Sequence, residues 1–259
     1  MGIKVAASDF DGTIFREQQI SAEDLESVRN WRLSGNKFGI VTGRAYVMLI
    51  SHLKQFDLAT DFNICCNGAI IYDGDGEIIF ETELSKEILL DIMKEPFVEA
   101  TKHYAFETAL KIYCARVKSS SWVLREKNLW NFPLEIIDAA EISRLPKINQ
   151  LALDFETPEE AYSAAKMLNK KFGEAIYAQK NTHSVDIVAK GINKSAGVEN
   201  LLRVMKWKAE TYVIGDESND LPMIRDFGGY TVATAKDFVK REAKTVFYSV
   251  GNMLNHFSR

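Results

Sequence analysis

Runs of apolar residues alternate with amphipathic segments over the first third of the chain. The first run, Ile3–Ser8, has almost no polar alternation, which is typical of a strand buried on both faces of a parallel sheet. A helix is expected after Ser21, which is a good N-cap candidate. Two more short buried strands are expected at Phe38–Val41 and Phe62–Cys66, with a helix between them. This order of elements predicts an α/β fold, with helices on both faces of a parallel sheet.

The pattern changes in the middle of the chain. Asp73–Gly76 is a strong hairpin-turn signal between two short apolar strands, and beyond it helices and strands follow no regular order. The expected elements are helices at Ser85–Lys94 and Thr157–Lys171 and strands at Lys111–Arg116, Gln150–Phe155 and Ala175–Gln179. We interpret residues 83–181 as an α+β domain inserted into a core domain that consists of residues 1–82 and 182–259.

Alternation of strands and helices returns in the last third. Strands are expected at Ser184–Val188, Thr211–Ile214, Tyr230–Ala233 and Thr245–Tyr248, with helices between them. All four are assigned to the core domain.

Polar side chains gather where the expected core strands end. They are Asp9 and Asp11 after the first strand, Thr42 after the second, Asp216, Asn219 and Asp220 after the strand at 211–214, and Lys194 at the start of a helix. Each has a simpler explanation by itself, such as a polar turn, a helix cap or a solvated lysine. Because the carboxyl ends of parallel strands face one edge of a sheet, these groups can nevertheless meet there.

The chemistry of this set favours a hard divalent cation together with a phosphate group. Carboxylate and carbonyl oxygens suit Mg²⁺, whereas softer metals prefer histidine or cysteine. None of the four histidines lies in these motifs, which argues against a zinc site and against a histidine-based catalytic triad. Two carboxylates as close in sequence as Asp9 and Asp11 also repel each other unless a cation or a proton lies between them.

Composition limits the kinds of molecule that the protein is expected to bind. The formal net charge is −4 and there is no dense run of lysine and arginine, so the sequence gives no support for nucleic-acid binding. No apolar run is long enough to span a membrane, and the N-terminus lacks the pattern of a signal peptide. Cys65, Cys66 and Cys114 have no metal-binding spacing and are expected to be free thiols in a reducing, cytoplasmic compartment. The sequence does not indicate an oligomeric state.

Four ordered motifs resemble those of the haloacid dehalogenase superfamily. They are Asp9-Phe10-Asp11-Gly12-Thr13, Thr42-Gly43-Arg44, Lys194, and Gly215-Asp216-x-x-Asn219-Asp220. Asn67-Gly68-Ala69 and the large insert between the second and third motifs are similar to the Cof-type phosphatases of class IIB, which carry a C2-type cap. The resemblance implies a Rossmann-like core sheet sandwiched by helices, with residues 83–181 as the α+β cap.

The resemblance also implies the roles of the three motif aspartates. Asp9 would be the nucleophile that forms an aspartyl-phosphate, and Asp11 would protonate the leaving alcohol and then activate water. Mg²⁺ would be held by the side chains of Asp9 and Asp216 and by the main-chain carbonyl of Asp11.

The remaining motif residues would bind the phosphoryl group or support the site. Thr42, Gly43, Lys194 and Asn219 would contact the phosphoryl oxygens, and Thr42 and Lys194 would thereby take part in catalysis. Asn219 and Asp220 would orient the groups around the metal.

We therefore expect a Mg²⁺-dependent phosphatase that acts on a small phosphorylated metabolite, such as a sugar phosphate. A cap of this size would exclude bulky polymers. The alternatives are a phosphomutase of the same superfamily, which would yield an isomerised sugar phosphate, and a non-catalytic protein that binds a phosphorylated metabolite. Intact Asp9, Asp11 and Asp216 argue against the last. Val232–Ala235 and Tyr248–Asn252 depart from the family's usual sequence, so the substrate does not transfer from better-known relatives.

Overall fold

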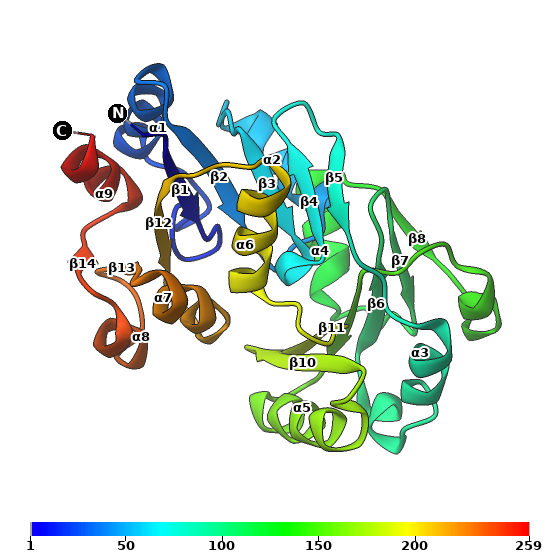
Figure 1. Ribbon diagram of the computed structural model, residues 1–259. Coiled ribbons are helices and arrows are strands. Elements are labelled where there is room, and N and C mark those ends of the chain that lie inside the picture. Colours follow the sequence, from blue (N-terminus) through cyan, green and yellow to red (C-terminus); the bar gives the residue numbers. More distant parts are fainter. Residues whose placement is uncertain (1, 259) are drawn as a thin grey trace. The chain divides into compact units, whose positions relative to one another are not determined.

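The computed structural model describes residues 2–258, which form two compact units (Figure 1). The first unit contains residues up to 42, residues 53–80 and residues from 193 onward. The second contains residues 43–52 and 81–192. Each unit has its own sheet and its own cluster of buried apolar residues.

A mixed eight-stranded sheet forms the centre of the first unit, in the order β14-β13-β12-β1-β2-β3-β4-β5. Its strands are β1 (Lys4–Ser8), β2 (Lys37–Val41), β3 (Phe62–Cys65), β4 (Ile70–Asp73), β5 (Ile78–Glu81), β12 (Glu210–Gly215), β13 (Tyr230–Val232) and β14 (Val246–Phe247). Strands β14 to β3 are parallel, and β4 is antiparallel to β3. In Figure 1 the blue β1 lies beside the gold β12, with Ser8 opposite Ile214. The strands that precede the two acidic motifs therefore end at the same edge of the sheet.

Helices cover both faces of the core sheet, as the α/β pattern predicts. They are α1 (Ala22–Leu33), α6 (Lys194–Val204), α7 (Leu221–Phe227), α8 (Asp237–Glu242) and α9 (Val250–Phe257), with short 3-10 turns η1 (Cys66–Gly68) and η4 (Ser218–Asp220). Residues 46–52 of helix α2 (Tyr46–Gln55) belong to the second unit. Apolar side chains of α6 and α7 share one buried cluster with Val5 and Ala7 of β1. On the opposite face, Tyr212 of β12 packs against Trp31 of α1 and Phe257 of α9.

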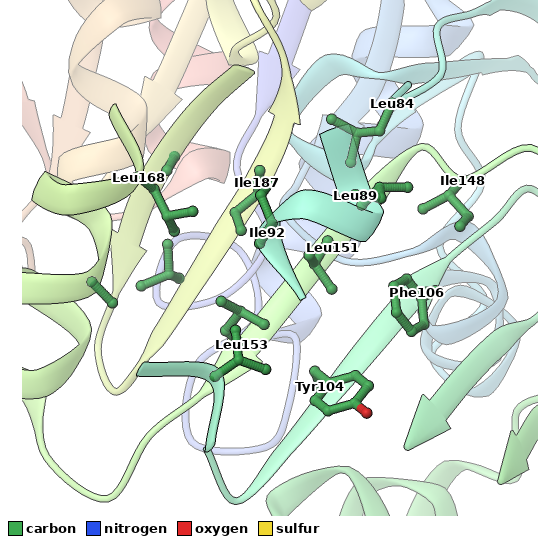
Figure 2. Packing of buried hydrophobic residues seen from close by; sticks show 14 of the residues in the cluster. Leu84, Leu89, Ile92, Tyr104, Phe106, Ile148, Leu151, Leu153, Leu168 and Ile187 are labelled. Carbon is green, nitrogen blue, oxygen red and sulfur yellow. The ribbon is translucent and has the colours of Figure 1, made fainter. Parts of the chain in front are cut away.

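The second unit is built on a six-stranded sheet in the order β10-β11-β9-β6-β7-β8. Its elements are α3 (Lys86–Ile92), η2 (Pro96–Ala100), β6 (His103–Glu107), β7 (Ile112–Ala115), α4 (Trp122–Trp130), β8 (Leu134–Ile136), η3 (Ala139–Arg144), β9 (Gln150–Asp154), α5 (Pro158–Phe172), β10 (Ile176–Asn181) and β11 (Ser184–Ala189). Figure 2 shows Leu89 of α3 and Leu168 of α5 packed with Leu151 and Leu153 of β9. This apolar face makes the unit a domain with its own core.

Strand β11 lies in the second sheet, whereas the sequence pattern assigned it to the core. It pairs antiparallel with β10 and β9, through a tight turn at Thr182 and His183. Thr182 has a φ of 52°, a conformation that usually signals glycine or asparagine. Because the turn contains neither glycine nor asparagine, the sequence did not predict a hairpin here, and the domain boundary was placed between its two strands. Strands β6 and β8 and helix α4 were also not predicted.

All three cysteines are buried, and none is part of a disulfide bond. Among residues 2–258, no helix combines the length and the apolar character needed to cross a membrane.

Candidate active site

Asp9 lies immediately beyond the end of β1 and is 4% exposed. Its backbone N–H donates to the carbonyl oxygen of Ile214 (2.9 Å), which extends the pairing of β1 with β12. The Nζ of Lys194 donates to Asp9 Oδ1 over 2.6 Å and to Asp220 Oδ1 over 2.6 Å. Three motifs that are far apart in the sequence thus meet in one buried network.

Burial governs the charges of this network. Burial raises the pKa of Asp9 well above its ordinary value; the negative charge of Asp220 adds to the effect, while Lys194 opposes it. Burial also raises the pKa of Asp216, and Asp220 again contributes. For Lys194, burial would lower the pKa, but the charges of Asp220 and Asp9 raise it. One ammonium therefore faces three carboxylates, and additional positive charge would be stabilising there.

Asp220 organises the loop that follows β12. Its Oδ2 accepts hydrogen bonds from the backbone N–H groups of Asp216 and Glu217, both over 2.9 Å. Glu217 in turn accepts from the N–H of Ser218 and pairs with Lys236. Asp220 binds Lys194 through one oxygen and the loop through the other. Both oxygens are therefore already engaged in hydrogen bonds that support the site.

Asp216 is held against the first motif. The hydroxyl of Thr13 donates to Asp216 Oδ1 over 2.8 Å, and Thr13 itself is fully buried. Gly12 has a φ of 82°, and a Cβ atom there would lie 2.4 Å from Asp216 Oδ2. Glycine is therefore required both by the backbone conformation and by the close approach of Asp216.

Local interactions at the start of α6 place Lys194 on Asp9. Asn193 is the N-cap residue, and its side chain accepts from the N–H of Ala196 over 2.9 Å. Ser195 donates to Asp226 Oδ2 of α7 over 2.6 Å, which fixes the first turn of the helix against its neighbour. The cap and this bond leave the Lys194 side chain directed into the acidic network.

The predicted phosphoryl-binding residues differ in their hydrogen-bond partners. Thr42 is buried beyond the end of β2, and its carbonyl oxygen accepts from the N–H of Asn67 over 3.0 Å. Asn219 is also buried, and its Nδ2 donates to Asn67 Oδ1 over 3.4 Å. Gly43 belongs to the second unit, where its carbonyl oxygen accepts from Gln150 Nε2 over 2.9 Å. The structure thus links Thr42 and Asn219 through Asn67 and does not place Gly43 in that group.

Asp11 is exposed, in contrast to Asp9. It lines a surface cavity of about 750 Å³ in the first unit, together with Gly12 and Asp216. The lining also includes polar and aromatic groups such as Arg16 and Tyr248. Asp11 therefore has access to solvent beside the buried network.

The donor set fits a hard divalent cation. Carboxylate oxygens of Asp9, Asp216 and Asp220 all lie within 4.8 Å of one another. All are oxygen donors, which suits Mg²⁺. Since both oxygens of Asp220 accept other hydrogen bonds, Asp9 and Asp216 are the better side-chain ligands.

Two supporting residues were not assigned a role from the sequence. Thr13 belongs to the first motif, but its bond to Asp216 depends on the parallel pairing of β1 with β12. Asn67 follows a buried strand in the same way as Asp9 and Thr42, and that position was the signal that would have identified it.

Comparison with known proteins is consistent with this geometry. A family model of haloacid dehalogenase-like hydrolases matches residues 6–252. The chain belongs to this family. The pyridoxal phosphate phosphatase YbhA of Escherichia coli is 24% identical over 257 residues, which cover 95% of this chain and 93% of that protein. The predicted membership in the haloacid dehalogenase superfamily is confirmed.

Solved structures of this family share the fold. A haloacid dehalogenase-like hydrolase from B. subtilis has a TM-score of 0.85 at 20% identity, covering 98% of this chain and all of that one. The HAD subclass IIB sugar phosphatase BT4131 has a TM-score of 0.79 at 23% identity, covering 98% of this chain and 99% of that one. The α/β fold predicted from the sequence is thereby confirmed as that of the haloacid dehalogenase family.

Proposed function

We propose that this protein is a Mg²⁺-dependent phosphatase that hydrolyses a small phosphorylated metabolite through an aspartyl-phosphate on Asp9. The observation that carries the proposal is the buried Lys194, whose Nζ bridges Asp9 and Asp220 at the end of β1. An ammonium at that distance from the nucleophile is also placed to stabilise the negative charge of a phosphoryl group.

In the first step, a carboxylate oxygen of Asp9 attacks the phosphorus atom of a phosphomonoester. The bond between phosphorus and the ester oxygen breaks, its electron pair remains on that oxygen, and Asp11 donates a proton to it. The alcohol leaves, and the phosphoryl group remains bound to Asp9. The exposure of Asp11 supports this role, because a leaving group needs space beside the proton donor.

In the second step, Asp11 accepts a proton from a water molecule that attacks the same phosphorus atom. The bond between phosphorus and Asp9 breaks, inorganic phosphate is released, and the Asp9 carboxylate is restored. Asp11 therefore ends each cycle protonated and ready to donate again.

Asp9 and Asp216 would hold Mg²⁺ through their side chains, and Asp11 would do so through its main-chain carbonyl. When bound, the ion supplies positive charge that offsets repulsion between the anionic nucleophile and the anionic phosphate. The raised pKa values of Asp9 and Asp216 support a cation at this position, because a cation would keep both groups ionised.

Thr42, Gly43, Lys194 and Asn219 are the proposed contacts of the phosphoryl oxygens. Burial of Thr42, Lys194 and Asn219 supports this assignment, because a buried donor interacts strongly with an anion. The place of Gly43 in this set rests on its position next to Thr42 in the motif.

The substrate class is inferred from relatives of this chain. The names of two of them, a pyridoxal phosphate phosphatase and a sugar phosphatase, both refer to small phosphorylated metabolites. We propose a sugar phosphate or a similar phosphomonoester here, without a nucleic-acid or membrane partner and in a cytoplasmic setting. The net charge of −4 and the three buried cysteines, which form no disulfide bond, support these last points.

Phosphate release from a panel of phosphorylated metabolites, with and without Mg²⁺, tests the proposal. Asp9→Asn keeps the size of the side chain and removes its charge, and it should lower turnover by at least about a thousandfold. Asp237→Asn, at a carboxylate that is 88% exposed, is the matched control and should leave turnover unchanged. The native protein should also show phosphorylated Asp9 after acid quench.

Other outcomes would redirect the assignment. An isomerised sugar phosphate in place of inorganic phosphate would indicate a mutase. Ligand binding without turnover over the whole panel would indicate a binding protein. Turnover that survives Asp9→Asn would show that Asp9 is not the nucleophile.

A further inference from the structure

The turn Cys66–Gly68, which follows β3, has an unusual backbone. Cys66, Asn67 and Gly68 have φ values of 50°, 52° and 105°. Left-handed conformations cost non-glycine residues roughly 1 kcal/mol or more each, and they persist where surrounding structure enforces them, often at functional sites. Asparagine tolerates this conformation better than most residues, so the backbone alone would explain its presence at position 67.

The side chain of Asn67 has a second relationship that the backbone does not require. Its Oδ1 accepts a hydrogen bond from Nδ2 of Asn219 over 3.4 Å, across 152 positions of sequence. Both residues are buried, with Asn67 2% and Asn219 7% exposed. The hydrogen bond fixes the orientation of the Asn219 amide, since one of its two N–H groups already donates to Asn67.

The same turn contacts the other two loops of the proposed phosphoryl pocket. The N–H of Asn67 donates to the carbonyl oxygen of Thr42 over 3.0 Å. Gly68 packs against the residue before Lys194, and a Cβ atom at Gly68 would lie 2.3 Å from the carbonyl oxygen of Asn193. The turn therefore touches the loops that carry Thr42, Lys194 and Asn219.

We propose that Asn67 is a positioning residue of the phosphoryl pocket, which acts by orienting the Asn219 amide and by fixing the Thr42 loop. The inference rests on the proposed function, since it requires Asn219 to contact the phosphoryl group. It assigns to the Asn-Gly turn a role in binding the anion rather than only in connecting β3 to β4.

Asn67→Gly tests the contribution of the side chain independently of the backbone conformation. Glycine adopts the same left-handed conformation without strain, so this variant keeps the turn and removes the side chain that accepts from Asn219. Asn131→Gly is the matched control, because Asn131 also has a left-handed φ, of 47°, and caps α4 in the second unit. Both variants should fold, and their thermal midpoints should stay close to that of the native protein.

The decisive measurement is a double-mutant cycle with Asn219→Ala. The dissociation constant of inorganic phosphate, from calorimetry with saturating Mg²⁺, should rise about tenfold in Asn67→Gly and remain unchanged in Asn131→Gly. In the Asn219→Ala background, Asn67→Gly should change the constant less than about twofold, because the residue acts through Asn219. The value of kcat/KM with Mg²⁺ should follow the same pattern.

Two results would overturn the proposal. Equal effects of Asn67→Gly in both backgrounds would show that Asn67 does not act through Asn219. Native phosphate affinity in Asn67→Gly would show that the side chain has no part in the pocket. If these occur while the native protein still releases phosphate, only this inference fails; if the native protein neither binds nor releases phosphate, the proposed function fails with it.

Discussion

The ammonium nitrogen of Lys194 lies 2.6 Å from a carboxylate oxygen of Asp220, and their side chains are 1% and 0% exposed. The same nitrogen is equally close to Asp9. A charge buried so deeply is tolerated because its partners are charged and within hydrogen-bond distance. Removal of the ammonium would leave two buried carboxylates to repel each other.

Lys194→Met should therefore abolish phosphatase turnover and destabilise the fold. Loss of one partner of a buried ion pair costs about 3–5 kcal/mol, which urea unfolding at pH 7 would detect. The deficit should shrink as the pH is lowered, because burial raises the pKa of Asp9 and thus favours the neutral form of that carboxyl. Lys190→Met is the control, since Lys190 is 51% exposed and pairs with the fully exposed Glu174. A Lys194→Met protein with native stability would contradict the burial argument.

Gly12 and Gly35 form a matched pair for testing the close approach of Asp216. Their φ values are 82° and 83°, but a Cβ atom at Gly12 would lie 2.4 Å from Asp216 Oδ2, whereas one at Gly35 would have nothing within 4 Å. Both Gly→Ala variants should lose roughly 1 kcal/mol of stability from the left-handed backbone. Only Gly12→Ala should also lose activity and need more Mg²⁺ for half-maximal turnover, because Asp216 must move.

Titration with Mg²⁺ and urea unfolding of both variants provide the check. Equal activity in Gly12→Ala and Gly35→Ala would mean that the position of Asp216 is not critical.

His103 should make the stability of the second unit depend on pH. It is fully buried in β6, with Nδ1 3.4 Å from Asp154 Oδ2. Burial, with a smaller contribution from Lys102, lowers the pKa of His103 to about 4. In the unfolded chain histidine titrates near 6.5, so between these values the unfolded state binds more protons. Stability should therefore fall as the pH is lowered from 6.5, by up to about 1.4 kcal/mol per pH unit.

Urea unfolding at several pH values between 7 and 5 measures this slope. His103→Gln should flatten it, while His256→Gln, at an exposed histidine, should leave it as in the native protein. A native slope in His103→Gln would show that another group titrates in this window. Asp154, whose pKa burial raises, is the neighbour to examine next.

Much of the core was predictable because its signals are local. The apolar run of β1 and the N-cap Ser21 of α1 depend on residues within one element, and the structure places both as expected. The hairpin β10–β11 was not predictable, because Thr182 takes a left-handed conformation that its residue type does not signal. Strand β6, which carries His103, was missed for a similar reason, because its polar residues resemble loop positions until its pairing with the predicted strand β9 is known.

The sequence by itself determined the α/β core, the family and the set of residues offered for chemistry, because residue type and short-range order carry that information. Only the tertiary structure decided which of those residues meet. Lys194 reaches Asp9 and Asp220 because α6 is capped by Asn193 and fixed through Ser195, and Asn67 reaches Asn219 because β3 and β12 end at the same edge of one sheet. The contacts of Lys194 with Asp9 and of Asn67 with Asn219 depend on strand order and helix packing across 185 and 152 positions of sequence, which no local pattern specifies.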